Sequence, residues 1–185
     1  MLRQLLDTGE FGDVKVVTAD FGADRTAPVF RPELGGGVLR DIGNYPVWFA
    51  PFVLGDQASM TERGSRIETG VDAQVAAILE TVDGAQAILS ATKLADTPVA
   101  ATISGTRARA EVWSPFLMPD GFDFVTAAEH STWPGDSGLR LREVLCWQAV
   151  AAAQHVADGL IESPIHSLDD SIAIMGILDS LREQA

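Results

Sequence analysis

The middle of the chain, residues 58–130, constrains the fold most, because apolar and polar residues alternate there with a period of two. That period is typical of half-buried strands. The clearest turn signal is Asp83-Gly84, which favours a two-residue type I′ hairpin between two such runs. Strands that follow one another on short turns predict an antiparallel sheet. The expected strands are 14–21, 59–68, 71–82, 85–94, 99–104, 108–113 and 122–128.

Both ends of the chain have helical spacing instead. A short amphipathic helix is expected at 2–7, and a second helix at 37–54 in spite of Pro46. Two more follow near the C-terminus, the last beginning at Ser167, where Ser167 and Asp170 approximate a capping box. Their expected buried stripes are Leu141, Val144, Leu145, Ala149, Ala152 and Val156, and Ile172, Met175, Leu178 and Leu181. Grouped strands between terminal helices predict an α+β fold: an open, mainly antiparallel sheet with helices on one face.

One face of this sheet is expected to have no helices over it, which bears on whether the chain forms oligomers. Residues 75–79 and 85–89 are apolar at nearly every position, which suits strands buried on both sides. The expected helices are too few to cover both faces. The sequence therefore predicts a homo-oligomer joined sheet to sheet.

Composition narrows the possible partners. A chain of 185 residues with 46% hydrophobic residues suits one domain with its own core. The net charge of −13 and scattered Lys and Arg residues argue against nucleic acid. With neither a signal-peptide pattern nor an apolar run of roughly 18 residues, no membrane partner is expected and the predicted location is the cytoplasm. The single cysteine, Cys146, rules out an internal disulfide and is expected to be a buried thiol.

Residues 35–46, with the sequence GGGVLRDIGNYP, hold the best candidate for chemistry. They set Asp41 four residues before Tyr45, the only tyrosine, so that a helix places both side chains on one face. A carboxylate beside a phenol is a plausible proton-handling pair, and the glycines would allow a tight entry or a ligand's close approach. The alternative is structural: the tyrosine ring packs in the core and the aspartate caps a helix. No nucleotide-binding fingerprint, P-loop or histidine metal spacing accompanies the pair.

Several short motifs occur in an order that resembles the C-terminal domain of the Gfo/Idh/MocA oxidoreductases. They are TGEFGDV at 8–14, FRPELGGG at 30–37 leading into DIGNYP at 41–46, TGVD at 69–72, VDGA at 82–85 and ISGT at 103–106. The resemblance runs from Leu2 almost to Ala185. It implies a single substrate-binding and oligomerisation domain over 1–185, with residues 1–10 a linker helix from a missing nucleotide-binding domain.

The resemblance also implies roles for individual residues. Asp41 and Tyr45 match the family's Asp-x-x-x-His/Tyr motif, which faces the substrate and the nicotinamide, so both are candidate catalytic residues. A phenol with its ordinary pKa near 10 needs a nearby cation, which the family takes from a lysine outside this chain. The candidate substrate-binding residues are Arg25, Phe30, Arg40, Trp113 and Phe116. Arg25 could instead be a solvated loop residue, and Trp113 and Phe116 could instead pack in the core.

The implied function is half of an NAD(P)-dependent dehydrogenase acting on a sugar, polyol or dihydrodiol-like secondary alcohol. NAD or NADP would be bound mainly by the absent domain, and the isolated chain would be inactive. A second reading is a non-catalytic oligomerisation or ligand-binding module derived from the same family. A third is a stand-alone isomerase that uses Asp41 and Tyr45.

Overall fold

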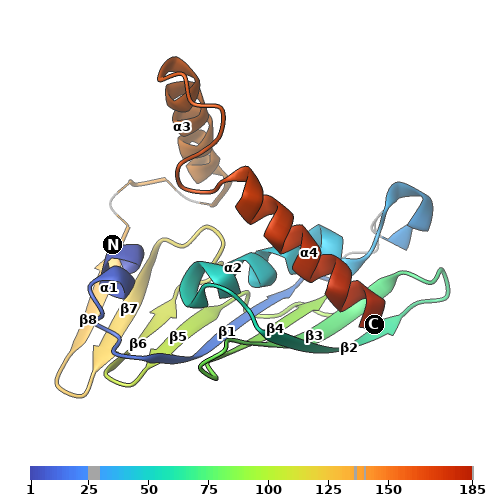
Figure 1. The fold of residues 1–185 in the computed structure, drawn as a ribbon, viewed down its shortest axis with the longest axis horizontal. Coiled ribbons are helices and arrows are strands. Elements are labelled where there is room, and N and C mark those ends of the chain that lie inside the picture. Colours follow the sequence, from blue (N-terminus) through green and yellow to red (C-terminus); the bar gives the residue numbers. More distant parts are fainter. Residues whose placement is uncertain (25–29, 136, 140, 185) are drawn as a thin grey trace.

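A computed structural model describes residues 1–24, 30–135, 137–139 and 141–184. Its main element is one sheet with the strand order β2-β3-β4-β1-β5-β6-β7-β8 (Figure 1). The strands are β1 (Val14–Gly22), β2 (Ser59–Arg66), β3 (Asp72–Glu80), β4 (Gln86–Thr92), β5 (Ala101–Gly105), β6 (Ala108–Val112), β7 (Gly121–Thr126) and β8 (His130–Pro134). Every neighbouring pair is antiparallel except β1 and β4, which are parallel. The predicted α+β fold with an open, mainly antiparallel sheet is confirmed.

The first strand lies in the centre of the sheet although it comes first in the chain. In the register, Val17 lies between Ala87 of β4 and Ile103 of β5, and all three side chains are fully buried. The parallel pairing follows because the chain returns to the sheet through β2 and β3 before β4 reaches β1. The sequence predicted the strands but not this insertion, since alternation reveals a strand's faces and not its neighbours.

Two details of the sheet correct the sequence-based expectations. The hairpin at Asp83-Gly84 exists, but its loop has three residues, because Thr81 N donates to Ala85 O and only Gly84 has a positive φ. This is the pattern of a type I turn followed by a left-handed glycine. Strand β8 was not predicted: its short, proline-ended sequence is typical of a sheet edge, where alternation is weak.

The helices gather on one side of the sheet. Helices α1 (Leu2–Asp7), α2 (Asn44–Leu54) and α4 (Leu168–Gln184) lie over one face, and the buried core fills the space beneath them (Figure 1). Short helical turns occur at Pro32–Leu34, Leu39–Gly43 and Leu141–Val144. The predicted capping box of α4 is confirmed, since Asp170 N donates to Ser167 Oγ and Ser167 N donates to Asp170 Oδ2.

The C-terminal helices are less buried than the sequence predicted. Helix α3 (Leu145–Ala157) stands away from the sheet and has no buried residue (Figure 1). The prediction of a buried stripe on this helix is therefore wrong, and Cys146 is exposed rather than buried. On α4, Leu178 and Leu181 are buried as predicted, while Ile172 and Met175 are exposed. Helical spacing predicted an apolar face correctly but could not show what would cover it.

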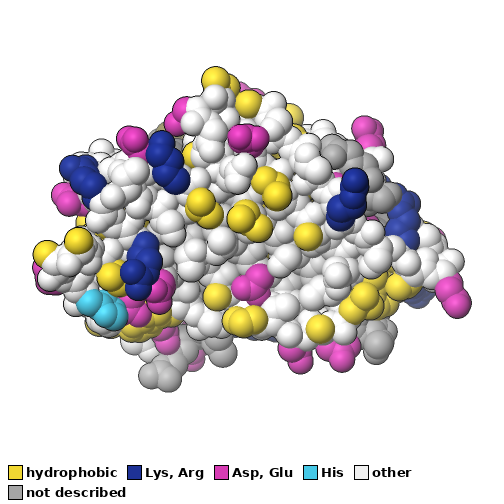
Figure 2. Space-filling model, turned by 90° about the horizontal axis from the view of Figure 1, so that it is seen from below, with side chains coloured by type: hydrophobic (Ala, Val, Ile, Leu, Met, Phe, Trp, Pro, Cys, Tyr) yellow, Lys and Arg dark blue, Asp and Glu magenta, His cyan; other side chains and the backbone are white. Residues whose placement is uncertain are grey.

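The other face of the sheet is open. Burial alternates along β3 and β4, so that alternate residues face away from the helices, among them Ile78 and Ile88, which pair in register. Apolar side chains lie across the middle of this face, with arginines and lysines toward its ends (Figure 2). Within the described residues, no helix is long and apolar enough to cross a membrane.

Candidate functional site

The helical segment that carries Asp41 and Tyr45 is held at its start by a buried carboxylate. Asp72, 4% exposed, accepts a hydrogen bond from Leu39 N at 2.7 Å. Gly37 has a φ of 136°, and a Cβ there would lie 2.2 Å from Asp72 Oδ1. The close approach that the glycines allow is therefore made by Asp72, which satisfies a free amide at the start of the helix.

Asp41 lies in a turn of π-helix, Leu39–Gly43, that runs directly into α2. Single π-helical turns within α-helices occur frequently at functional sites. Lys93 follows β4, and its Nζ lies 2.5 Å from Asp41 Oδ2. The lysine side chain is only 5% exposed, whereas that of the aspartate is 40% exposed. A buried ammonium is thus neutralised by a carboxylate whose other side still reaches solvent.

Tyr45 follows Asp41 by one helical turn and lies over the end of β1. Its ring packs against Phe21 with the centroids 5.6 Å apart, and the residue remains 40% exposed. Phe21 pairs with Ala91 across the parallel strands, and Lys93 follows two residues later on the same face. The Asp41–Lys93 ion pair and the Tyr45 ring therefore both lie near the carboxyl ends of the two parallel strands, β1 and β4.

A largely apolar pocket of about 380 Å³ opens beside Tyr45. Helix α2 supplies four of its nine lining residues, and Leu2, the end of β6 and the segment after it supply the others. It is lined by Leu2, Tyr45, Trp48, Phe49, Phe52, Val112, Phe116, Leu117 and Pro119. An aromatic pocket with one phenol at its edge can hold the carbon skeleton of a small molecule and present a hydroxyl to Tyr45.

A second pocket, of about 480 Å³, lies between α2 and α4. Trp48 lines both pockets, and its indole N–H points to His166 Nδ1 at 3.4 Å. His166 also lies 3.1 Å from Ser171 Oγ, so this histidine connects α2 to the first turn of α4. The described residues contain no group of three or more His, Cys, Asp or Glu side chains placed to hold a metal ion.

The structure brings only some of the candidate substrate residues to Tyr45. Phe116 lines the pocket and packs against Phe49 at 5.5 Å. Trp113 instead donates its indole N–H to Asp123 Oδ2 at 2.8 Å, outside the pocket lining. Arg40 faces Asp179 of α4 at 3.9 Å.

The two remaining candidates precede the helix that carries Asp41. The carbonyl of Phe30 accepts a hydrogen bond from Thr69 beside the β2–β3 turn, and the residue does not line the pocket. Arg25 lies outside the described residues. Among the five candidate substrate residues, Phe116 is thus the one that the described geometry places beside Tyr45.

Sequence reasoning missed Lys93, Phe21 and Trp48. The local sequence Ala91-Thr92-Lys93-Leu94 continues an apolar strand pattern, and a lysine there resembles an ordinary strand end. One signal could have been used: Lys93 keeps the inward phase of Leu89 and Ala91, so the alternation itself places a lysine on the buried face.

Comparison with known proteins matches this chain and its fold to one family. A profile described as the GFO/IDH/MocA C-terminal domain matches residues 1–111. This chain belongs to the Gfo/Idh/MocA family and corresponds to its C-terminal domain. It is similar to trans-1,2-dihydrobenzene-1,2-diol dehydrogenase from Xenopus laevis, with 38% identity over 192 residues, covering 99% of this chain and 58% of that protein. The human enzyme of the same name is 30% identical over 195 residues, covering 98% of this chain and 57% of that protein.

Solved structures agree on the fold. An aldose-aldose oxidoreductase from Caulobacter crescentus has a TM-score of 0.84 at 18% identity, covering 99% of this chain and 56% of that one. A levoglucosan dehydrogenase in complex with NADH and L-sorbose has a TM-score of 0.83 at 17% identity, covering 99% and 59%. In all of these comparisons the chain spans less than three fifths of the relative's length.

Proposed function

We propose that this domain is the substrate-binding half of an NAD(P)-dependent oxidoreductase that acts on a secondary alcohol of a dihydrodiol, sugar or polyol. The observation that carries the proposal is the position of Tyr45 at the edge of an aromatic pocket, four residues after Asp41, which pairs with the buried Lys93. A curated relative 38% identical is a dihydrodiol dehydrogenase, and the pocket's apolar walls favour a carbocyclic skeleton. Residues 1–10 would then link the domain to the nucleotide-binding part.

In the proposed reaction, Tyr45 exchanges a proton with the substrate hydroxyl at its phenolic oxygen. The sequence resemblance took the nearby cation from a lysine outside the chain, but Lys93 supplies a positive charge within it. Asp41 holds that ammonium in place beneath the helical turn before Tyr45. The aromatic walls would orient the carbon skeleton and exclude water from the reacting hydroxyl.

The described residues fit one side of a nicotinamide site only. Tyr45 and Trp48 are about two-fifths exposed at the mouth of the pocket, which leaves room for a flat ring to approach. The sequence has no glycine-rich fingerprint to hold a pyrophosphate. NAD or NADP, when bound, supplies hydride chemistry, and we propose that it is held mainly by the nucleotide-binding part of the longer enzyme.

The test uses this chain fused behind the N-terminal two fifths of the Xenopus laevis relative, assayed with NADP or NAD and trans-1,2-dihydrobenzene-1,2-diol. Tyr45→Phe should lower kcat by about a hundredfold or more, because a proton-transfer group is lost. KM should change little, since the ring remains in the pocket wall. Trp113→Phe, which lies outside the pocket, is the control and should leave kcat within a few fold. Micromolar NADH binding or turnover by the unfused 185-residue chain would contradict the half-site proposal.

The rival function is a ligand-binding or oligomerisation module without chemistry. It predicts that the fusion binds the diol but turns it over no faster than the background rate, with or without Tyr45→Phe. The retained Asp41–Lys93 pair argues against this rival, because a buried lysine is costly to keep where it does nothing. We also propose that the open face of the sheet, around Ile78 and Ile88, joins two copies of the chain.

A further inference from the structure

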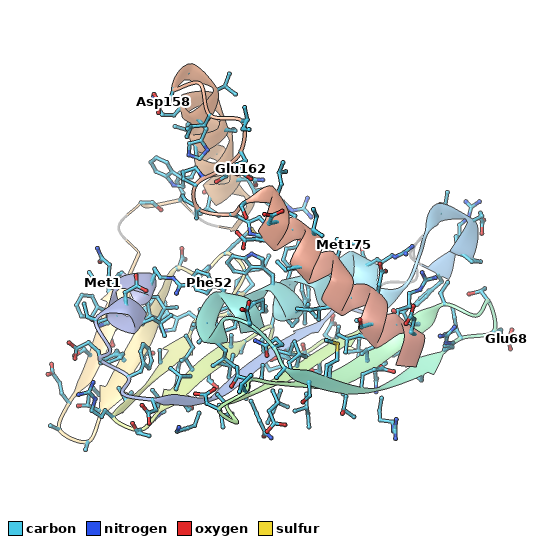
Figure 3. The ribbon with its side chains drawn as sticks, in the orientation of Figure 1. Met1, Phe52, Glu68, Asp158, Glu162 and Met175 are labelled. Atoms are coloured by element: carbon cyan, nitrogen blue, oxygen red, sulfur yellow. The ribbon has the colours of Figure 1, made fainter. Side chains whose placement is uncertain are left out.

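The second pocket of the structure takes no part in the proposed reaction. It encloses about 480 Å³ between α2 and α4, and Met60 at the start of β2 also lines it. Figure 3 labels Phe52 on α2 and Met175 on α4, the two helices that flank it. We call it the α2–α4 pocket. Ligand pockets commonly have volumes of about 300–1,000 Å³, so this one is large enough for a small organic molecule.

The long walls of the α2–α4 pocket are apolar. On the α2 side, Trp48 and Phe52 stack with their ring centroids 4.8 Å apart. The guanidinium carbon of Arg3 lies 4.2 Å from the Phe52 ring centroid, and Arg3 also donates a hydrogen bond to the carbonyl of Phe52. On the α4 side, the wall includes Ile174 and Ile177. Aromatic and branched aliphatic walls of this kind suit a ring compound.

Two polar side chains that line this pocket already have partners. His166 Nδ1 accepts a hydrogen bond from the Trp48 indole N–H at 3.4 Å, and His166 Nε2 lies 3.1 Å from Ser171 Oγ. Both ring nitrogens of the histidine are therefore engaged. Asp170 Oδ2 accepts a hydrogen bond from a backbone N–H at the start of α4, at 2.8 Å. These groups hold the two helices in place and leave little capacity for a ligand.

Gln57 lines the same pocket and differs from these residues. Its Nε2 donates to the carbonyl of Gly55 at 2.6 Å, which assigns the orientation of the amide. Its Oε1 is buried, and the described residues provide no donor for it. A buried carbonyl oxygen without a donor is unfavourable. The pocket therefore offers one acceptor to a molecule that brings an O–H or N–H group.

We infer that the α2–α4 pocket is a binding site for a small uncharged ring compound that carries a hydroxyl group. The ring would lie between Phe52 and the α4 wall, and the hydroxyl would donate to Gln57 Oε1. An anion is disfavoured, because Asp56 and Asp170 also line the pocket and Arg3 is held against an aromatic ring. An ammonium group would place its charge opposite a neutral amide, which does not compensate for burial. The inference does not rest on the proposed function.

The test is an NMR titration of the 185-residue chain with 2-naphthol. Intermolecular NOEs should connect the naphthol ring to the methyl groups of Ile174 and Ile177. A second probe, 2-methoxynaphthalene, has the same rings without the donor and should bind about tenfold more weakly. Gln57→Leu should remove this preference by weakening the binding of 2-naphthol alone, because leucine accepts no hydrogen bond. Equal affinity of the unsubstituted chain for the two probes overturns the inference.

The matched variants change α4 inside and outside the pocket. Ala173 lines the pocket and is exposed, so Ala173→Phe narrows the pocket without entering the core, and it should weaken 2-naphthol binding at least tenfold. Met175→Phe, on the same helix but outside the lining, should leave binding unchanged. Binding that Ala173→Phe does not affect overturns the inference. NOEs to Val112 and Leu117 alone do so too, because they place the probe in the pocket beside Tyr45.

The same titration in the fusion with the N-terminal two fifths of the Xenopus laevis relative separates this inference from the proposed function. The NOEs to Ile174 and Ile177 should persist there. Their loss overturns the inference, because the added region then fills the pocket. A fusion that oxidises the diol but does not bind 2-naphthol sinks only the ligand site. A fusion that binds 2-naphthol in this pocket without turnover of the diol sinks only the proposed oxidoreductase.

Discussion

At the scale of single residues, Gly37 and Asp72 fix the helical turn that carries Asp41. The carboxylate of Asp72 occupies the space that a side chain at position 37 would need, and the φ of 136° is one that other residues rarely adopt. Gly37→Ala should therefore lower the free energy of unfolding by about 2 kcal/mol or more, from strain and a displaced cap. Gly70→Ala is the control: its φ of 82° is also positive, but nothing lies within 4 Å, so about 1 kcal/mol is expected. Equal losses in urea titrations would show that the contact with Asp72 adds nothing.

The same residues show how much of the candidate site could be predicted from the sequence alone. The spacing of Asp41 and Tyr45 predicted one shared helical face, because that relation is local. The sequence could not predict the ion-pair partner of Asp41, because Lys93 lies beside it only as a result of the pairing of β4 with β1. Asp72 was noticed within a motif, but its role depends on the close approach of two segments 33 residues apart. Local spacing was predictable in this segment, and contacts that depend on neighbouring strands were not.

At the scale of elements, the edge strand β2 carries the carboxyl group of Glu62 beneath helix α4. Glu62 is 1% exposed on the face that α4 covers, and neither of its oxygens has a hydrogen-bond partner within the described chain. Burial raises the pKa of Glu62 above its usual range, and the nearby charge of Asp72 adds to the rise, while Arg63 and Arg66 oppose it. Because the folded state binds this proton more tightly, the stability present at low pH is lost as pH rises through the folded pKa.

Glu62→Met should therefore stabilise the domain at pH 7, by about 1–3 kcal/mol, because it removes an unpartnered buried group and keeps the volume. The margin over the unsubstituted chain should shrink as pH falls through and below the ordinary glutamate pKa of about 4.3, because the proton is then bound in both states. Glu68→Met, at the exposed β2–β3 turn, should differ from the unsubstituted chain by no more than about 0.5 kcal/mol. A margin that is constant from pH 7 to pH 4 would argue against a titrating Glu62.

Elements with strong local signals were predicted best. Helix α1 and the capped start of α4 agree with their sequence signals, and the paired strands of the central region agree within a few residues. The edge strand β8 lacked such signals. Helix α3 was predicted as a helix, but its environment was wrong, because an apolar sequence shows that contact is needed and not whether the same chain supplies it.

At the scale of the whole molecule, two apolar surfaces lie on opposite sides of one sheet. We propose that the apolar pocket beside Tyr45 faces the nucleotide-binding part of the longer enzyme and that the open face contacts a second copy of the chain. The two contacts do not compete, since one lies on the helix side and the other on the side shown in Figure 2. In this proposed arrangement the sheet would join two copies of the chain and hold each Tyr45 toward its own cofactor.

The open-face contact can be tested without any other domain. Ile78 and Ile88 pair in register on the second and third strands of the sheet and are 44% and 46% exposed, so they form an apolar pair on that face. The unsubstituted chain should sediment as a dimer at micromolar concentration. Ile88→Lys should raise the dissociation constant at least tenfold, about 1.4 kcal/mol, because two-fold symmetry brings two unpaired charges into one interface. Its circular dichroism should not change, since Ile88 points away from the core, and Val82→Lys at the hairpin tip should leave the dimer intact. If the unsubstituted chain sediments as a monomer at that concentration, the proposed contact is contradicted. The open faces would then provide too little apolar contact to hold two sheets together.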